Sequence, residues 1–350
     1  MNSTVLRIVD ANLNRLAEGL RVMEEAARMI LDDAGLTARL KTLRHDLIRG
    51  GAAFNLELLN SRDSVEDVGA DLIVTGESPR KDLFTIMVAN ARRAQESLRV
   101  LEDLAKLPET AGKLESDRFK QARFELYTLE QQLVQRLIRK DRQKKISGLY
   151  VILDTQVLNG RSHIEAAGKV IQAGVKVIQL RDKTTPKKLL IPLARDLQAL
   201  CWQNDVLFIM NDYLDVALAV DADGLHIGQE DLPVAEARKL LPPHKILGCS
   251  ASTVEEAQAA EAEGADYIAV GSIFPTGSKN DVDVVGPERL RLVKPFIHVP
   301  LAAIGGINKN NAREIVEAGA DSLCVISAVL LAPDIALAAR QIIEIIEAKK

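Results

Sequence analysis

The sequence predicts an all-α N-terminal domain with an internal helical repeat, followed by an α/β domain of the (β/α)8 TIM-barrel class. Three observations support this prediction. The chain of 350 residues is long for one ordinary domain and suits two. Apolar residues recur every three or four positions in residues 5–140, as on one face of a helix. From residue 146, short β-rich apolar runs alternate with helical stretches. We place the helical domain at 1–142 and the barrel domain at 146–350.

The helical domain is expected to contain five or six helices. Its last helix, at about 115–142, ends in the polar run RKDRQKK, which we interpret as a linker. Within the domain, residues 11–27 resemble residues 89–105 at an offset of 78 positions. The identical pairs include polar as well as apolar residues: Asn12/Asn90, Arg15/Arg93, Glu18/Glu96, Leu20/Leu98, Arg21/Arg99, Val22/Val100 and Glu24/Glu102.

The repeated Arg and Glu residues have two interpretations. Positions 15, 18 and 21 advance by threes and form a charged ridge on a helix. Such a ridge is either a solvated face with ion pairs worth little in stability, or a buried polar network or anion site. The carboxylate-rich loop 62–71 is likewise either a capped turn, through Asp63 or Ser64, or a substrate loop. The sequence contains no G-x-x-x-x-G-K-[ST], so any ATP site here would not be a P-loop.

The barrel domain contains eight apolar runs, which we interpret as eight buried parallel strands. They are LYVILD (149–154), VKVIQL (175–180), VLFIM (206–210), GLHI (224–227), KILGCS (245–250), DYIAVG (266–271), PLAAIG (300–305) and SLCVIS (322–327). Glycine precedes several of them, as at a helix C-cap that leads into the next strand. A doubly wound sheet is the alternative, but the first turn, LDTQVLNG, lacks its Gly-rich fingerprint.

Charged residues follow these strands at the end where barrels keep their sites. Arg181, Lys183 and Lys279 supply three cations, and alternation points Gln179, Arg181 and Lys183 the same way. Asp212 and Asp231 supply hard oxygen ligands suited to Mg²⁺ shared with substrate phosphates. This combination suits a pyrophosphate. Gly305, Gly306, Ile326 and Ser327 follow the last two strands, where such barrels commonly bind one phosphate.

Each of these residues also has a structural interpretation. A single Arg or Lys after a strand is usually a surface charge, and Asp212 could cap the next helix. His226 is interpreted as a packed core histidine without a catalytic role. Gly305 and Gly306 could form only a tight turn. The functional interpretation rests on their occurrence together at the ends of six of the eight strands.

Composition excludes several classes of function. Aromatic residues make up 3% of the chain, too few for the stacking platforms that bind single-stranded nucleic acid. The three cysteines lack the spacing of a disulfide framework or a zinc site. Neither a signal peptide nor an apolar stretch of about 18 residues is evident. We therefore expect a cytoplasmic protein without nucleic-acid or membrane partners. Its oligomeric state is left open, with a homo-oligomer as one alternative.

The barrel domain resembles the thiamine-phosphate synthase (thiamine-phosphate pyrophosphorylase) family across residues 146–350. The motifs are LYVILD, QLRDK, MNDYLDVALAVDADGLHIGQEDLP, LGCSAST, AVGSIFPTGSK, IGGIN and VIS. The resemblance implies that hydroxymethylpyrimidine diphosphate loses pyrophosphate while the nitrogen of thiazole phosphate attacks the freed methylene, in a dissociative substitution. A sister branch that aromatises the thiazole needs no machinery for a diphosphate leaving group, so the basic and acidic residues here favour the synthase.

The resemblance also implies a role for each matching residue. Arg181, Lys183, Lys279 and Ser250 would be catalytic. Asp212 and Asp231 would bind Mg²⁺ as the cofactor. The substrate-binding residues would be Gln179, Leu180, Arg181, Asp182, Lys183, Asn211, Ser250, Thr276, Gly277, Ser278, Lys279, Gly306, Ile326 and Ser327. The partners would be the two small-molecule substrates.

The helical segment resembles the N-terminal domain fused to some synthases of this family. That resemblance rests on the paired N-xx-R-xx-E-xx-R-xx-E repeats and on RDSVEDVG. It implies a hydroxymethylpyrimidine phosphate kinase that would supply the diphosphate substrate. A structural or oligomerisation module is the alternative.

Overall fold

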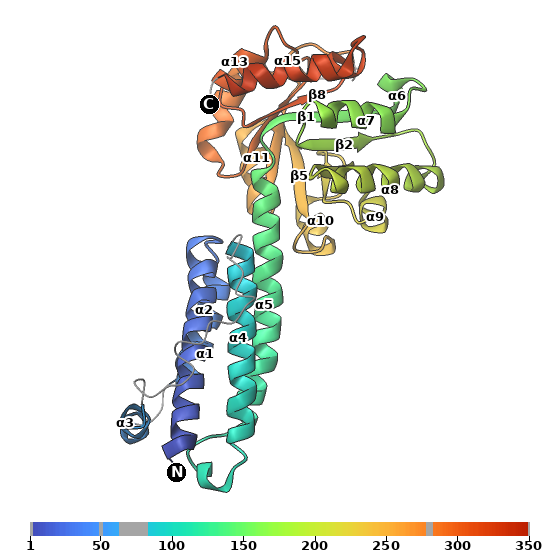
Figure 1. The fold of residues 1–350 in the computed structure, drawn as a ribbon. Coiled ribbons are helices and arrows are strands. Elements are labelled where there is room, and N and C mark those ends of the chain that lie inside the picture. Colours follow the sequence, from blue (N-terminus) through green and yellow to red (C-terminus); the bar gives the residue numbers. More distant parts are fainter. Residues whose placement is uncertain (1–2, 49–51, 63–82, 278–282, 349–350) are drawn as a thin grey trace. The chain divides into compact units, whose positions relative to one another are not determined.

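The structure is a computed structural model that describes residues 3–48, 52–62, 83–277 and 283–348. It divides into two compact units, Met1–Ile138 and Arg139–Lys350. The first is helical and the second is an α/β barrel (Figure 1). None of the helices in the described part of the chain has the length and apolar content that a membrane span requires.

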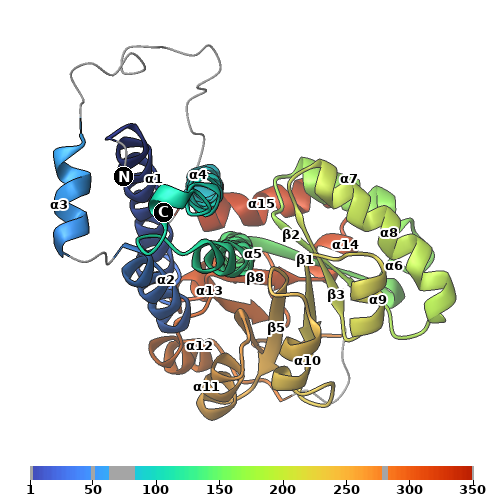
Figure 2. The same cartoon turned by 90° about the horizontal axis from the view of Figure 1, so that it is seen from below.

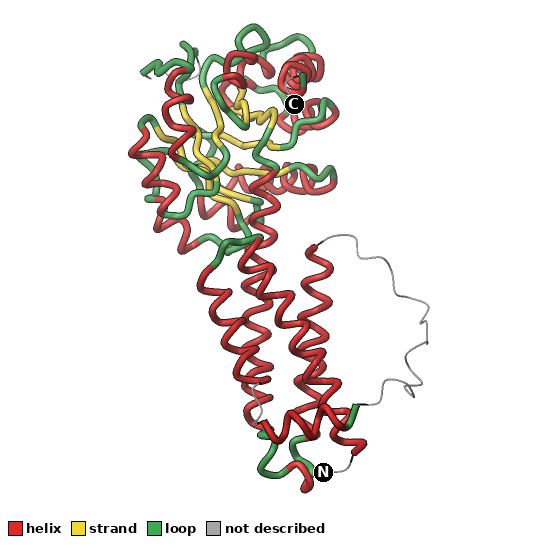
Figure 3. Tube along the Cα trace, turned by 90° about the vertical axis from the view of Figure 1, so that its left-hand side faces the viewer, coloured by secondary structure: helices red, strands yellow, loops and turns green. Residues whose placement is uncertain are grey.

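The helical unit is built around one long apolar core. Its elements are α1 (Ser3–Met29), α2 (Ala34–Ile48), α3 (Ala52–Asn60), α4 (Leu83–Leu104), a 3₁₀ turn at Pro108–Thr110 and most of α5 (Ser116–Lys144). Figures 1 and 3 show α1, α2, α4 and α5 side by side. Apolar residues of α1 at helical spacing form part of this core: Leu16, Leu20 and Met23 are fully buried, and Leu13 is partly buried. A Cβ added at Gly19 would lie 2.7 Å from the carbonyl oxygen of Asn90, so glycine permits the close contact between α1 and α4.

The sequence repeat corresponds to a repeated helix pair, α1–α2 and α4–α5. Asn12 and Asn90 each donate a hydrogen bond of 2.8 Å from Nδ2 to the carbonyl four residues earlier. Glu24 is paired with Arg44 of α2 at 2.9 Å. Glu102 is paired with Arg123 of α5, also at 2.9 Å. Both buried glutamates of the repeat therefore have an arginine partner on another helix.

The charged ridge of the repeat is exposed. Its residues on both helices are solvent-accessible: Arg15, Glu18 and Arg21 on α1, and Arg93, Glu96 and Arg99 on α4. The two interpretations of the repeat thus apply to different residues. Asn12, Glu24 and Glu102 are buried polar groups, whereas the Arg and Glu residues of the ridge lie on the surface.

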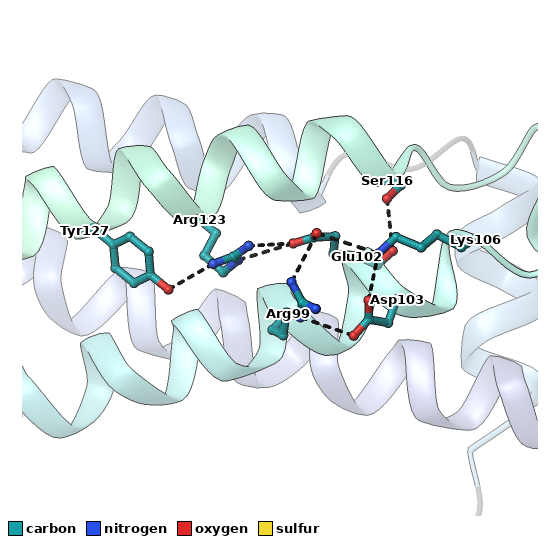
Figure 4. Close-up of polar contacts among 7 residues, drawn as sticks. All are labelled: Arg99, Glu102, Asp103, Lys106, Ser116, Arg123 and Tyr127. Atoms are coloured by element: carbon teal, nitrogen blue, oxygen red, sulfur yellow. Dashed lines mark hydrogen bonds and ion pairs between the residues drawn. The ribbon is translucent and has the colours of Figure 1, made fainter.

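Figure 4 shows the ion-pair cluster around Glu102, whose side chain is 5% exposed. Arg99 Nη1 lies 3.4 Å and Lys106 Nζ 3.8 Å from its Oε1, and Arg123 binds its Oε2. The hydrogen bond from Arg123 is the main cause that holds the pKa of Glu102 below its usual value. Arg123 also donates to the Tyr127 hydroxyl at 3.0 Å. These contacts tie α4 to α5.

The second unit contains a closed barrel of eight parallel strands, as predicted. They are β1 (Gly148–Asp154), β2 (Val177–Arg181), β3 (Leu207–Asn211), β4 (Gly224–Ile227), β5 (Ile246–Ala251), β6 (Tyr267–Val270), β7 (Leu301–Ile304) and β8 (Ser322–Val325). Each strand coincides with one of the eight apolar runs to within one residue at the ends that extend beyond the run. Neighbouring strands pair in chain order, and β8 pairs with β1 to close the barrel.

Helices surround the strands (Figure 2). They are α6 (Thr155–Leu158), α7 (His163–Gln172), α8 (Lys187–Gln203), α9 (Leu214–Ala219), α10 (Val234–Leu240), α11 (Val254–Ala262), α12 (Glu288–Val293), a 3₁₀ turn at Lys294–Phe296, α13 (Ala312–Glu317), α14 (Ser327–Leu330) and α15 (Ile335–Glu347). One apolar cluster lies between strands and helices, and a smaller one fills the barrel.

The polar run RKDRQKK is not a linker, because helix α5 continues through it to Lys144. Tertiary contacts at the N-terminal ends of the strands account for this. Arg142 pairs with Asp223 at 2.6 Å and donates to the carbonyl of His244 at 2.9 Å. Gln143 donates to the carbonyl of Asp266 at 2.8 Å. The boundary between the compact units accordingly falls inside α5.

Candidate active site

The C-terminal ends of the strands surround a cavity of 410 Å³. All eight strands or the segments directly after them contribute to its lining. This is the end at which (β/α)8 barrels keep their active sites, because the βα loops converge there. Most of the residues singled out from the sequence line it: Gln179, Arg181, Lys183, Asn211, Asp212, Asp231, Ser250, Thr276, Gly306, Ile326 and Ser327.

Strand alternation decides which residues of QLRDK reach the cavity. Gln179, Arg181 and Lys183 line it, as alternation predicts. Leu180 does not, because it points to the other face and is buried in the cluster between strands and helices. The resemblance assigned substrate contacts to Leu180, and the structure places it elsewhere.

Asp182 also lies outside the cavity, contrary to the role that the resemblance implied. Its carboxylate accepts hydrogen bonds from the backbone amides of Thr184 and Thr185, at 2.9 and 2.8 Å, and from the Thr155 hydroxyl at 2.8 Å. Burial alone would raise the pKa of Asp182, but these donors lower it to about 2. Asp182 therefore shapes the loop after β2.

The loop after β6 is described in part. Thr276 lines the cavity, whereas Gly277 is exposed and outside the lining. Ser278 and Lys279 lie outside the described residues, as do residues 63–69 of the RDSVEDVG motif. Their expected roles stay predictions.

Arg181 is held in place by a carboxylate that the sequence analysis did not single out. Asp154 at the end of β1 forms a short ion pair with Arg181 Nη1. Its other oxygen caps α6 by accepting from the amides of Gln156 and Val157 at 3.0 and 3.1 Å. The Asp154 carboxylate thus fixes the start of α6 and the orientation of the Arg181 guanidinium beside the cavity. The sequence feature that could have indicated Asp154 is its position as the acidic last residue of the first apolar run, LYVILD.

Two carboxylates face each other in the cavity. Asp212 follows β3 with φ of 60°, and it does not cap α9, which begins without a side-chain cap. Burial raises the pKa of Asp212, and the hydrogen bond and charge of Asp231 raise it further. Lys183 Nζ, 3.3 Å from Asp212 Oδ2, opposes that rise. Asp231 Oδ2 accepts from the amide of Gly228 at 2.7 Å.

This pair fits a divalent cation. Two half-buried carboxylates repel each other, and a cation between them would remove that repulsion. Among the described residues, no cluster of three His, Cys, Asp or Glu could hold a metal by itself. The remaining ligands would then be water or substrate oxygens, the arrangement that Mg²⁺ favours with phosphates.

The loop after β7 lies against the loop after β6. Gly305 and Gly306 have positive φ values of 106° and 63°. A Cβ on Gly306 would lie 2.6 Å from the carbonyl oxygen of Pro275, and one on Gly305 would lie 2.1 Å from the Ser272 hydroxyl. The two glycines are therefore required by backbone conformation and by packing. They expose main chain beside Ile326 and Ser327 in the same cavity.

Three residues of the barrel interior form a hydrogen-bonded chain with Ser250. The hydroxyls of Tyr150 and Tyr267 are 3.0 Å apart. The Tyr267 hydroxyl lies 3.1 Å from His226 Nδ1, and His226 Nε2 lies 3.0 Å from Ser250 Oγ. His226 was expected to be a packed core histidine, and it does pack on Tyr267 with ring centroids 5.6 Å apart. It also lines the cavity, which strand-end motifs alone did not indicate.

Comparison with known proteins finds a family match for each unit. Residues 149–329 match the family described as Thiamine monophosphate synthase, and residues 7–132 match the ThiD2 family. The thiamine-phosphate synthase of Synechocystis sp. is 40% identical over 329 residues, which cover 94% of this chain and 92% of that protein. The thiamine-phosphate synthase of Moorella thermoacetica is 50% identical over 199 residues, which cover 57% of this chain and 95% of that protein.

A solved structure is similar to the barrel unit. Thiamine phosphate pyrophosphorylase from Pyrococcus furiosus has 39% sequence identity and a TM-score of 0.54. The match covers 59% of this chain and 98% of that chain.

Proposed function

The chain belongs to the thiamine-phosphate synthase family of transferases, and we propose that its barrel cavity performs the family's reaction with the residues described above. In that reaction, hydroxymethylpyrimidine diphosphate and thiazole phosphate give thiamine phosphate and pyrophosphate. The observation that supports this assignment is one cavity whose two ends, after β2 to β4 and after β7 and β8, both carry groups that suit an anion. Arg181, Lys183 and the Asp212–Asp231 pair lie at one end, and the Gly305–Gly306 turn with Ser327 lies at the other.

The first end suits the diphosphate. Arg181 presents a guanidinium whose orientation is set by Asp154, and Lys183 adds a second cation. Asn211, the last residue of β3, is buried beside them. By its motif, Lys279 would add a third cation. Members of this family use a metal ion, and we propose Mg²⁺ held by Asp212 and Asp231. When bound, it would supply further positive charge to the diphosphate oxygens.

The second end suits the thiazole phosphate. The positive-φ turn at Gly305 and Gly306 leaves backbone N–H groups accessible where a side chain would block approach. Thr276, Ile326 and Ser327 line the same region. By their motifs, Gly277 and Ser278 would complete it.

The chemistry requires stabilisation of a leaving group. The bond between the pyrimidine methylene and the diphosphate oxygen breaks, and its electron pair leaves on pyrophosphate. The thiazole nitrogen then forms the new bond to the methylene carbon. Arg181 and Lys183 stabilise the charge that develops on the leaving oxygens, and the enclosed barrel interior limits access of water to the methylene. The substitution itself requires neither a general base nor a protein nucleophile.

The assay supplies both substrates with Mg²⁺ and measures thiamine phosphate by liquid chromatography. Wild-type protein is expected to form product. An Arg181→Ala variant should lose activity by about 10²–10³-fold, the effect of removing one transition-state donor. Arg195→Ala, an arginine of α8 away from the cavity, serves as the control. Absence of product from folded wild-type protein would refute the proposal.

For the helical unit we propose a second activity, formation of the pyrimidine diphosphate from its monophosphate. The observation that favours it over a purely structural module is the repeated exposed ridge, because a helical core does not require Arg15/Arg93 or Glu18/Glu96. Full-length Asp231→Asn protein, impaired in the barrel, is incubated with the monophosphate, ATP and Mg²⁺. If this protein forms the diphosphate and adding Arg15→Ala and Arg93→Ala abolishes its formation, the kinase is supported. If the Asp231→Asn protein itself forms no diphosphate, the structural module is favoured.

A further inference from the structure

The hydrogen-bonded chain from Tyr150 to Ser250 depends on one glycine. Asn211, His226, Gly248 and Tyr267 are register partners on the neighbouring strands β3 to β6. A Cβ on Gly248 would lie 2.0 Å from Cζ of Tyr267 and 2.4 Å from its hydroxyl oxygen. The Tyr267 ring therefore occupies the space above β5 that a side chain at position 248 would fill. Only in this way does its hydroxyl reach His226 on β4.

The number of protons restricts how this chain can be ordered. Tyr150, Tyr267, neutral His226 and Ser250 each carry one polar hydrogen, and three links join them. Burial raises the pKa of both phenols, so each retains its proton. Three hydrogens fill the links, and the fourth remains at one end of the chain. The direction of donation decides which end.

The two directions differ in where the fourth proton lies. If Ser250 donates to His226, the last donor is the hydroxyl of Tyr150, a residue that is 1% exposed although it borders the cavity. In the described part of the chain, that hydroxyl has no hydrogen-bond partner other than Tyr267. If Tyr150 donates to Tyr267, the last donor is Ser250, whose side chain faces the cavity. A buried donor without an acceptor costs free energy, so the second direction is favoured.

We propose that Tyr150 donates to Tyr267, Tyr267 donates to His226 Nδ1, and His226 donates from Nε2 to Ser250, which directs the Ser250 proton into the cavity. His226 is thereby held as the Nε2–H tautomer. Tyr150, Tyr267 and His226 are positioning residues, and Ser250 is the group that meets the substrate. Gln229 Nε2 forms a short hydrogen bond to the carbonyl of Ser250, which fixes the backbone at the same point.

The consequence for catalysis rests on the proposed function. A hydroxyl whose oxygen already accepts from His226 donates more strongly, because hydrogen bonds in a chain polarise one another. Ser250 then provides a preoriented donor to an anionic phosphate oxygen of the pyrimidine substrate. Its benefit is greatest when charge accumulates on the leaving group, so disruption of the chain should lower kcat more than it raises KM.

The direct test is the tautomer of His226 in the substrate-free protein. Long-range ¹H–¹⁵N NMR distinguishes a protonated ring nitrogen from a bare one. The chain has five histidines, and the signals lost in His226→Gln identify the one of interest. We expect protonated Nε2 and bare Nδ1 in wild type, and a mixture of tautomers in Tyr267→Phe. Tyr127→Phe in the helical unit is the control and should leave the His226 signals unchanged. Protonated Nδ1 in wild type would overturn the proposal, and this result requires only that His226→Gln folds for the assignment.

Activity provides the second test. Tyr267→Phe should lower kcat roughly tenfold, the effect of one misdirected hydrogen bond, with a smaller change in KM. His226→Gln retains an N–H donor near the Nε2 position, and His226→Leu has similar size without a donor. The glutamine variant should therefore retain more kcat than the leucine variant. Equal kcat in these two folded variants would contradict the positioning role. Because the NMR result does not depend on turnover, failure of the proposed reaction remains distinguishable from failure of this proposal.

Discussion

The buried carboxylates of the helical unit and the half-buried carboxylates of the barrel cavity have opposite kinds of partner. Glu24 and Glu102 of the helical unit each have an arginine partner at 2.9 Å from a neighbouring helix. In the barrel, Asp212 faces a second carboxylate, Asp231, and its pKa is raised. A fully paired carboxylate serves the fold, whereas two that oppose each other require a ligand. The comparison separates structural acidic residues from functional ones by their partners.

The strongest test of this comparison is Asp231→Asn. Loss of one carboxylate removes the repulsion at Asp212 and weakens the site for a cation. We expect activity to fall by about 10²–10³-fold, in the range of other losses of charge stabilisation. The pKa of Asp212 should fall while burial still raises it, and a carboxylate NMR titration without Mg²⁺ can follow the change. Retention of full activity with unchanged Mg²⁺ dependence would show that the pair is not a metal site.

Gly248→Ala tests, in the barrel, how tightly the Tyr267 ring packs over β5. The added Cβ would overlap the Tyr267 ring. We expect a loss of about 1–3 kcal/mol in the free energy of unfolding, the usual cost of overpacking a core, together with reduced kcat. Gly168→Ala in α7 is the matched control, because its Cβ would meet no atom within 4 Å. Urea denaturation measures the free energy of unfolding of both variants, and the thiamine phosphate assay measures their kcat. A Gly248→Ala protein as stable as wild type would mean that Tyr267 can move aside freely.

Glu102→Gln tests the helical side. Removing the charge leaves Arg123 with a weaker partner in the cluster of Figure 4. The melting temperature of the helical unit should fall by a few degrees, while synthase kcat stays at the wild-type value. Glu96→Gln, an exposed position of the same repeat, should change neither quantity. Differential scanning calorimetry with the thiamine phosphate assay distinguishes these outcomes. A loss of synthase kcat in Glu102→Gln would contradict a purely structural role.

The smallest expected effect concerns Asp182. Its pKa is about 2 in the folded protein and close to 3.8 when unfolded. A depressed folded pKa contributes stability that is fully present above the unfolded value and is lost as the pH falls through the folded value. Between about pH 4 and about pH 2, the free energy of unfolding of wild type should therefore decline more steeply than that of Asp182→Asn. Parallel curves from urea titrations would show that the Asp182 carboxylate is not stabilised in the fold.

Strand positions were predictable because the strands are buried on both faces and read as continuous apolar runs. Strand alternation then oriented Gln179, Arg181 and Lys183 correctly, since the side-chain period is local. The same rule excludes Leu180 from the cavity, although the family motif had included it. Alternation predicted the position of Leu180 correctly because it states to which face of the strand a side chain points. A family motif states only which residues are adjacent in the sequence.

Features that depend on distant partners were not predictable. Helix α5 continues through the polar run because Arg142 and Gln143 meet Asp223 and the carbonyl of Asp266. Such contacts compensate for the weak intrinsic helix stability of a charged segment, and local sequence patterns do not predict them.

The sequence alone determined the order of the elements, the helical repeat and the end of the barrel at which the polar residues gather, because these follow from periodicities of a few residues. Tertiary structure decided which of those residues meet. The pairing of β3 with β4 places Asp212 against Asp231, and only the missing side chain of Gly248 allows Tyr267 to reach His226. The physical reason is that hydrogen bonds and charge interactions act over a few ångströms in space, at any separation along the chain.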